Sequence, residues 1–136
     1  MSMSTGNTRQ TMARYFESAE PDVSLFAPDV AFTMMATGDT YRGPDQVRQM
    51  LDYYYRDAFD ARAEARNVLI DGDHAVWEGH FIGEHTGDFV GLAATGKKVC
   101  VPLVVLYDLK DGLIHKARFY LELPVLLQQI GVGQEA

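Results

Sequence analysis

One segment near the N-terminus, residues 26–47, constrains the fold of this chain more than any other. Its sequence, FAPDVAFTMMATGDTYRGPDQV, predicts a strand over residues 30–35, an open loop, and then a helix with Pro44 in its first turn. A helical pattern precedes this segment, and four strand patterns follow it. That order predicts an α+β fold, in which a curved and mostly antiparallel sheet wraps around helices. Such a cone encloses an apolar pocket, so the residues that line the pocket decide the function.

Periodicity and turn residues predict the other elements within a single domain over residues 8–131, with a flexible leader at 1–7 and a tail at 132–136. The predicted helical segments cover residues 8–20, 22–26, 44–55 and 124–130. The predicted strands after the third helix cover residues 61–70, 75–84, 98–108 and 113–121.

Composition argues against several classes of partner. The 136 residues include 12 Lys and Arg against 19 Asp and Glu, a formal net charge of −7, which disfavours nucleic acid because phosphate binding needs clustered cations. No apolar run approaches the roughly 20 residues of a membrane span, so no membrane partner is expected. The single cysteine, Cys100, excludes an internal disulfide and favours a reducing, cytoplasmic setting. Because Cys100 lies in an apolar run, we expect a buried, inert thiol.

The strand at residues 99–107, VCVPLVVLY, is apolar on both faces. An antiparallel strand with one wet face would instead alternate between apolar and polar residues. Both faces must therefore be covered, one by the helices and the other by a second subunit. This pattern predicts a homodimer that forms through the convex face of the sheet.

Several short motifs, taken in order, resemble the nuclear transport factor 2-like superfamily and, within it, the SnoaL-like polyketide cyclases. The motifs are FAPDV at 26–30, YRGP at 41–44, GEHTGDF at 83–89, ATGKKV at 94–99, DGLI at 111–114, and the closing strand and helix at 120–131. The resemblance covers nearly the whole chain. It implies a cone that binds a small apolar ligand, cyclic or polyketide-like, and cofactor-free acid/base ring closure or isomerisation. No cofactor is expected.

The first helix also resembles that of the ketosteroid isomerases, a branch of the same superfamily. The motif MARY places Tyr15 where the family's tyrosine donates a hydrogen bond to a developing enolate oxygen. Met34 and Val105 stand where the isomerases carry a base aspartate and a protonated acid, and neither side chain can move a proton. The isomerase mechanism is therefore disfavoured. Leu103 and Val105 also replace two members of the Asp-Arg-Asp relay of limonene epoxide hydrolases.

The strand at 75–84 allows two interpretations. Glu78 and His80 are two residues apart, so they share a face with Val76, and Trp77 and Phe81 share the other. The pattern alone predicts that the Trp77 face is buried. The resemblance implies the opposite, with Glu78 and His80 as an acid/base pair inside the cone and with Trp77 and Phe81 against a partner subunit.

The resemblance also assigns a role to Glu122, because many SnoaL-like proteins end the last strand with an acid/base aspartate. Glu122 keeps the carboxylate with one extra methylene, which moves its reach by roughly an ångström. The expected catalytic residues are Tyr15, Glu78, His80 and Glu122. The expected substrate-binding residues are Met34, Tyr54, Val76, Leu103, Val105, Phe119 and Leu121.

Two alternatives to an enzyme stay open. A non-catalytic ligand-binding protein fits the missing acids, and a protein-interaction module fits if Trp77 and Phe81 are exposed. No metal is expected, because no cluster of His and carboxylate residues matches a ligand motif. A Gly-rich loop at 88–96 is a candidate cover for the pocket mouth. His85 is expected to order that loop through Asp88 rather than to act in catalysis.

Overall fold

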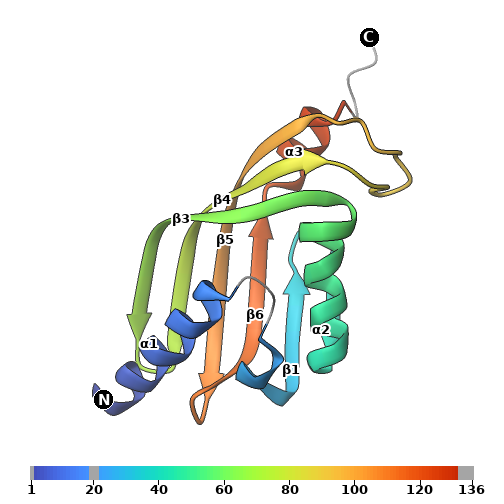
Figure 1. Ribbon diagram of the computed structural model, residues 1–136. Helices are drawn as coiled ribbons and strands as arrows, with labels where there is room; N and C mark the ends of the chain where they lie inside the picture. The colour runs from blue at the N-terminus through green and yellow to red at the C-terminus, as the bar shows by residue number, and fades with distance from the viewer. Residues whose placement is uncertain (1, 19–21, 132–136) are drawn as a thin grey trace.

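The computed structural model describes residues 2–18 and 22–131. One six-stranded sheet, in the order β2-β1-β6-β5-β4-β3, curves around an apolar interior (Figure 1). The helices are α1 (Ser2–Glu17), α2 (Gly43–Asp52) and α3 (Leu123–Gln129). The strands are β1 (Phe26–Met34), β2 (Asp39–Arg42), β3 (Phe59–Asp71), β4 (His74–His85), β5 (Lys98–Lys110) and β6 (Leu113–Leu121). A 3₁₀ turn at Val23–Leu25 precedes β1, and a π-helical turn at Tyr53–Asp57 follows α2.

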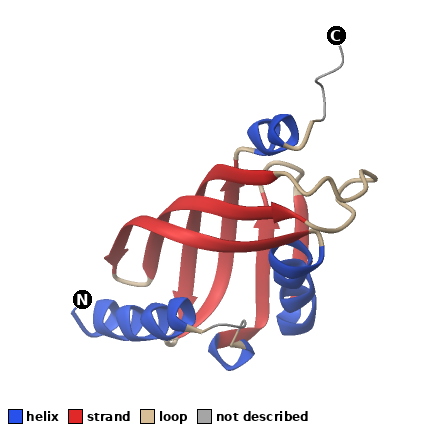
Figure 2. Cartoon of the chain, turned by 45° about the horizontal axis from the view of Figure 1, so that its top comes forward, coloured by secondary structure: helices blue, strands red, loops and turns tan. Residues whose placement is uncertain are grey.

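The predicted α+β architecture is confirmed. Strands β3 to β6 form an antiparallel meander, and β1 joins it as a parallel neighbour of β6. Helices α1 and α2 lie against the concave side of the sheet, and α3 lies beyond one end (Figure 2). The concave face therefore meets helices, while the convex face of the isolated chain carries none.

Strand β2 is the element that the sequence pattern missed. Residues 39–43 read as a turn-rich approach to Pro44, yet Asp39–Arg42 pairs antiparallel with β1. The hydroxyls of Thr33 and Thr40 lie 3.0 Å apart across this pair. Because none of the four residues is buried, no apolar alternation marks this strand, and the pairing with β1 holds it.

Strand β5 alternates in burial although its sequence is apolar throughout. Its odd-numbered residues face the interior and are buried, namely Val99, Val101, Leu103, Val105, Tyr107 and Leu109. Its even-numbered residues face the convex side and are exposed or half-buried. The expectation of a buried Cys100 is wrong, because strand alternation places this thiol on the convex face, where it is exposed.

Two threonines fasten α1 to the ends of two hairpins. The Thr8 hydroxyl donates to the Gly72 carbonyl in the β3–β4 turn at 2.7 Å, and the Thr11 hydroxyl donates to the Gly112 carbonyl in the β5–β6 turn at 2.6 Å. Both threonines are buried, so water competes poorly for these bonds. Since Tyr15 lies one helical turn beyond Thr11, these bonds fix where its side chain enters the interior.

The substitution Thr11→Val should lower the free energy of unfolding by about 1–2 kcal/mol, because it removes the donor to Gly112 without changing side-chain shape. Urea denaturation measures the loss. Ser18→Ala is the matched control, since the Ser18 hydroxyl bonds only its own helix, at the Arg14 carbonyl, and is exposed. It should cost less than about 0.5 kcal/mol. Equal losses in the two variants would show that Thr11 does not hold the helix in place.

Candidate functional site

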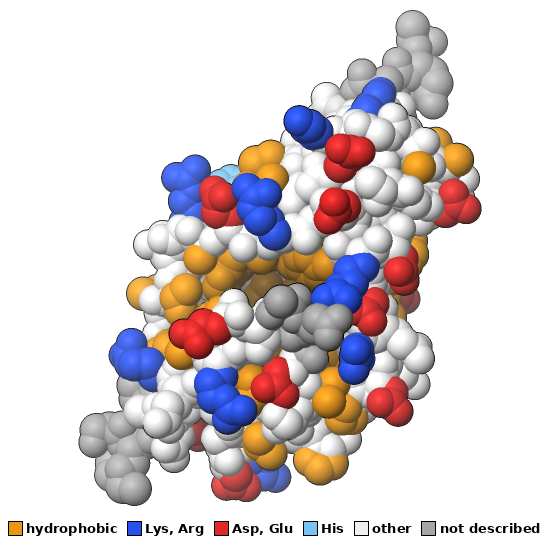
Figure 3. Space-filling model, in the orientation of Figure 1, with side chains coloured by type: hydrophobic (Ala, Val, Ile, Leu, Met, Phe, Trp, Pro, Cys, Tyr) orange, Lys and Arg blue, Asp and Glu red, His pale blue; other side chains and the backbone are white. Residues whose placement is uncertain are grey.

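The concave side of the sheet and the inner faces of α1 and the π-helical turn enclose a cavity of about 470 Å³. Figure 3 shows a hollow with hydrophobic walls, and Lys, Arg, Asp and Glu side chains lie around it. Six aromatic residues line the cavity: Tyr15, Phe16, Tyr55, Trp77, Tyr107 and Phe119. Among the described residues, its exposed rim includes Asp52, Arg56, Asp60 and Arg62.

The floor of the cavity is a row of side chains from adjacent strands. Trp77 on β4 stands opposite Val105 on β5, and Val105 stands opposite Phe119 on β6. Gly79 leaves room for the Trp77 ring. A Cβ at Gly79 would lie 2.8 Å from the ring and would also collide with the backbone of β3. A glycine two residues after the tryptophan thus allows the indole to lie along the strand.

Two tyrosines, the half-buried Tyr15 and the buried Tyr107, lie in contact in the wall of the cavity. The rings of Tyr15 and Tyr107 meet edge to face, with centroids 5.8 Å apart. Burial raises the pKa of both phenols, and the nearby Tyr55 phenol raises them further. A side-chain interaction between the two tyrosines partly offsets this rise in the pKa of Tyr15 and adds to it for Tyr107. Each phenol has one O–H donor, so either tyrosine can donate a hydrogen bond to a ligand in the cavity.

The cavity has two kinds of polar group, the tyrosine phenols of its wall and the carboxylates of its rim. Burial also raises the pKa of Tyr55, so all three interior phenols are neutral hydrogen-bond donors at physiological pH rather than bases. Among the described lining residues, the carboxylates are Asp52 and Asp60 at the rim. The Asp52 carboxylate lies 3.9 Å from Arg56 and also 3.9 Å from Arg48. The interior can therefore donate to an acceptor, and proton abstraction is possible only near the mouth.

Residues 8–130 match the family model for SnoaL-like polyketide cyclases. The chain belongs to the SnoaL-like polyketide cyclase family. Its fold is similar to that of a protein from Jannaschia sp. CCS1 described as a SnoaL-like polyketide cyclase, with a TM-score of 0.82, 22% identity and 92% of each chain covered. It is also similar to a ketosteroid isomerase-like protein from Catenulispora acidiphila, solved in complex with trimethylamine, with a TM-score of 0.71, 20% identity and 92% of each chain covered. No curated protein matches the chain.

For this SnoaL-like chain, the predicted placement of Glu78 and His80 inside the cone is wrong. Trp77 and Phe81 occupy the inner face of β4 and are 4% and 2% exposed. Glu78 is exposed on the convex face, where it accepts a hydrogen bond from the Asn67 amide at 2.6 Å. The sequence pattern alone correctly predicted that the Trp77 face of β4 is buried. The resemblance wrongly implied that Glu78 and His80 face the interior. Burial of Trp77 and Phe81 within one chain also removes the surface that the interaction-module alternative required.

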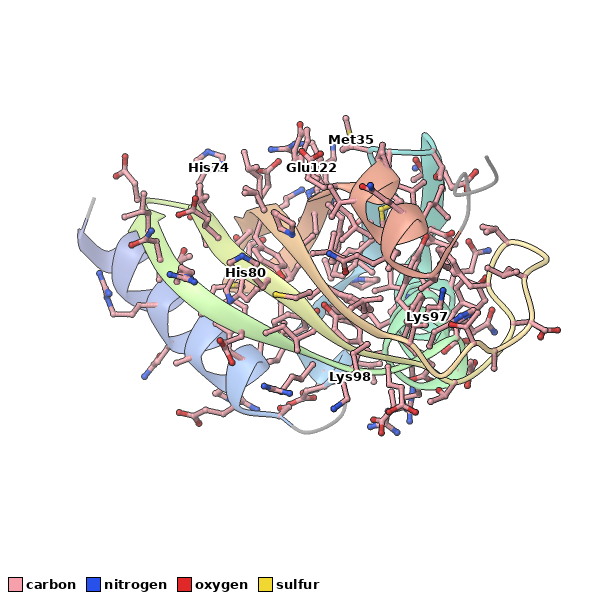
Figure 4. The ribbon with its side chains drawn as sticks, turned by 90° about the horizontal axis from the view of Figure 1, so that it is seen from above. Met35, His74, His80, Lys97, Lys98 and Glu122 are labelled. Carbon is pink, nitrogen blue, oxygen red and sulfur yellow. The ribbon has the colours of Figure 1, made fainter. Side chains whose placement is uncertain are left out.

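Val76 and Glu122 also lie outside the cavity. Val76 shares the convex face with Glu78 and is half-buried there. Glu122 is exposed where α3 begins, and its carbonyl accepts from the Val125 and Leu126 N–H groups. Figure 4 places Glu122 on the side of the sheet away from α1. Neither residue is among those that line the cavity.

The structure brings the other predicted residues together in two neighbouring spaces. Tyr15, Leu103, Val105 and Phe119 line the cavity. Met34, Tyr54 and Leu121, together with Leu103 and Phe119, line a small crevice beside it.

Sequence reasoning missed four of the six aromatic residues that line the cavity, namely Phe16, Tyr55, Trp77 and Tyr107. Tyr107 follows Leu103 and Val105 at a spacing of two, so strand periodicity would have found it. Trp77 was assigned to a partner subunit on the basis of the resemblance. The sequence predicts Tyr54 rather than Tyr55 as a ligand-binding residue, because no sequence pattern indicates the π-helical turn that follows α2.

The loop at 88–96 does not contribute to the cavity, since none of these residues, all of them described, lines it. His85 does hold the base of the loop, as expected, but through Thr95 rather than Asp88. The Thr95 N–H donates to the His85 Nδ1 atom at 3.2 Å, and the fully buried imidazole stacks on Phe59. Because a backbone N–H can only donate, Nδ1 carries no proton in this arrangement.

No group of three His, Cys, Asp or Glu residues in the described part of the chain is placed to hold a metal ion. None of the described helices has both the length and the apolar character needed to cross a bilayer.

Proposed function

We propose that the cavity binds a small, flat, largely apolar cyclic molecule, polyketide-like in character, and that a carbonyl oxygen of this ligand accepts a hydrogen bond from Tyr15. The observation that carries the proposal is the edge-to-face pair of Tyr15 and Tyr107 in the wall of an aromatic cavity. A volume of about 470 Å³ lies within the range of small-molecule sites. Because the phenols in the cavity stay protonated, each can donate a hydrogen bond to a ligand acceptor such as a carbonyl oxygen.

Ring-shaped ligands suit this cavity better than flexible chains. Aromatic side chains from α1, the π-helical turn and three strands present faces and edges to the same space. Flat rings contact such walls over a large area and lose little conformational freedom on binding. Trp77 is the only tryptophan of the chain and lies in the cavity wall, so its fluorescence reports directly on occupancy.

The Tyr15 bond is tested with a matched ligand pair, 9-fluorenone and fluorene, which differ in the carbonyl. The substitution Tyr15→Phe should weaken fluorenone binding about five- to tenfold, the value of one neutral hydrogen bond, and should leave fluorene binding unchanged. Titration of Trp77 fluorescence gives both dissociation constants. Tyr120→Phe is the control, because Tyr120 is exposed on β6.

Two outcomes would count against this function. If neither ring binds to the wild type, the cavity is not a site for flat apolar molecules. If Tyr15→Phe weakens both ligands equally, the tyrosine contributes packing and does not recognise the carbonyl.

Catalysis of ring closure or isomerisation is a second candidate, favoured by one rim carboxylate. Asp60 lines the cavity and, unlike Asp52, has no arginine within ion-pair distance among the described residues. A carboxylate at the mouth can take a proton from the carbon beside a ligand carbonyl, and the Tyr15 hydroxyl can stabilise the enolate oxygen that forms. No step in this scheme uses a cofactor.

The proton-transfer step is tested by deuterium exchange at the α-carbon of 2-tetralone in D₂O, followed by NMR. The substitution Asp60→Asn should slow the catalysed exchange about 100-fold or more, because removing a positioned base costs that much. Asp71→Asn, the same change at the far end of β3, should leave the rate within about twofold. If the wild type exchanges no faster than buffer, the chain binds without catalysing, which is the alternative function.

The convex face supports a homodimer as the assembly in which this site works. Strands β4, β5 and β6 leave a patch of partly exposed apolar side chains on this face. They are Val76, Ile82, Pro102, Val104, Leu106 and Tyr120. Apolar side chains gathered on one face of a sheet favour association, and here Glu78 and His80 lie among them. The single thiol, Cys100, lies on the same face and can report whether the face is covered.

The substitution Val104→Asp should convert the dimer to a monomer, because it adds a second carboxylate directly opposite Glu78 in the interface. Light scattering after size-exclusion chromatography gives the mass. Cys100 should react with a thiol reagent faster in the variant than in the wild type. Val90→Asp is the control, since Val90 is 64% exposed in the distant loop. A wild type that is monomeric at all concentrations would rule out the dimer.

A further inference from the structure

A small apolar crevice continues the cavity toward β1 and α2. It measures about 10 Å³ and shares part of its wall with the cavity, through Leu51, Tyr55, Leu103 and Phe119. Its far wall is formed by residues that do not touch the main cavity, among them Met34, Met50 and Leu121. The crevice thus adjoins the ligand space along these four shared residues.

The crevice and the cavity lie along the same row of the sheet. The row runs from Trp77 through Val105 to Phe119, and Met34 on β1 stands next to Phe119. Neighbouring strands are about 4.8 Å apart, so Met34 lies one strand spacing beyond the last aromatic residue of the cavity. A ring that rests on Trp77 and Val105 therefore points one edge at the crevice.

The crevice offers nothing to a polar group. Its lining residues are Met, Leu, Phe and Tyr. Burial raises the pKa of Tyr54, and the nearby Tyr41, Tyr53 and Asp39 raise it further, so its phenol stays protonated. A space of this size holds at most one water, and that water would need two or more polar partners. The crevice is dry, and its lining atoms lack packing partners.

Two methionines make the crevice adaptable. Met34 comes from the sheet and Met50 from α2, and each is 3% exposed. Methionine is unbranched and has three rotatable side-chain bonds, so a pair of them can move apart by a fraction of a side chain at low cost. A methyl or ethyl group can then enter, whereas a polar substituent or a long chain cannot.

We propose that the ligand of this cavity is a cyclic ketone that carries a short alkyl substituent, and that the crevice between Met34, Met50 and Leu121 is the subsite for that substituent. This inference rests on the proposed function. It adds a direction to the bound ligand: the carbonyl lies toward Tyr15, and the alkyl group lies across the sheet toward β1. It also names Met50 and Leu121 as specificity-determining residues, which, like Met34, line the crevice and not the cavity.

The test uses 9-fluorenone and its four monomethyl isomers, with ethyl and butyl homologues of the isomer that binds best, all titrated by Trp77 fluorescence. One methyl isomer should bind about fourfold tighter than fluorenone, the value of one buried methylene, and the butyl homologue should gain nothing more. The substitution Leu121→Phe, which fills the crevice, should abolish the methyl gain and leave fluorenone within about twofold.

The substitution Met50→Ala enlarges the crevice and should move the preferred substituent from methyl to butyl. Leu109→Ala is the matched control, because Leu109 is buried but lines neither space. The methyl resonances of Met34 and Met50, assigned with Met34→Leu and Met50→Leu, should shift with the alkyl ligands and stay in place with fluorenone.

Three results would overturn the subsite. If fluorenone binds and no methyl isomer binds more tightly, the proposed function stands and the subsite is wrong. The same conclusion follows if Met50→Ala and Leu109→Ala change the alkyl preference alike. If fluorenone and all its alkyl derivatives fail to bind, the proposed function and the subsite fall together.

Discussion

The pleat of strands β4 and β5 is the constraint on which the rest of this structure depends. Successive side chains of a strand point to opposite faces, so the inward position of Trp77 forces Glu78 outward, and that of Val105 forces Val104 outward. Gly79 fixes the phase of β4, because any side chain there would collide with the Trp77 ring and with the backbone of β3. One phase thus creates an aromatic cavity on one side of the sheet and a partly apolar outer face on the other.

Most of the fold could be predicted because its elements carry local signals. Alternation, turn glycines and Pro44 mark strands and helices wherever one face is buried and the other is wet. The strand Asp39–Arg42 carries no such signal, since none of its residues is buried, and only pairing with β1 reveals it. The start of β1 at Phe26 was hidden for a related reason, because Leu25 and Phe26 read as the apolar side of a helical turn.

The site was predicted only in part, and the missed residues have identifiable causes. Tyr15 was found because helical spacing places it on the buried side of α1. The π-helical turn after α2 shifts the register of the following residues, so helical periodicity no longer shows that Tyr55 lines the cavity. For Glu78 and His80, strand alternation gave the correct face, and positions carried over from distant relatives replaced it with the wrong one. Alternation within this chain is a direct physical constraint, whereas a register carried over from a relative depends on aligning each strand to the residue.

The chemistry of the cavity follows from where charge is tolerated. Burial keeps the phenols of Tyr15 and Tyr107 neutral, and the carboxylates stay at the rim where water solvates them. Strand β5 supplies Leu103 and Val105 to the cavity wall while its intervening residues form the convex face. A second copy bound to the convex face would support the cavity wall from outside. The cavity mouth would stay open, because it lies on the concave side of the sheet. The proposed ligand site and the proposed dimer surface therefore use opposite faces of the same strands, so the two interactions would not compete.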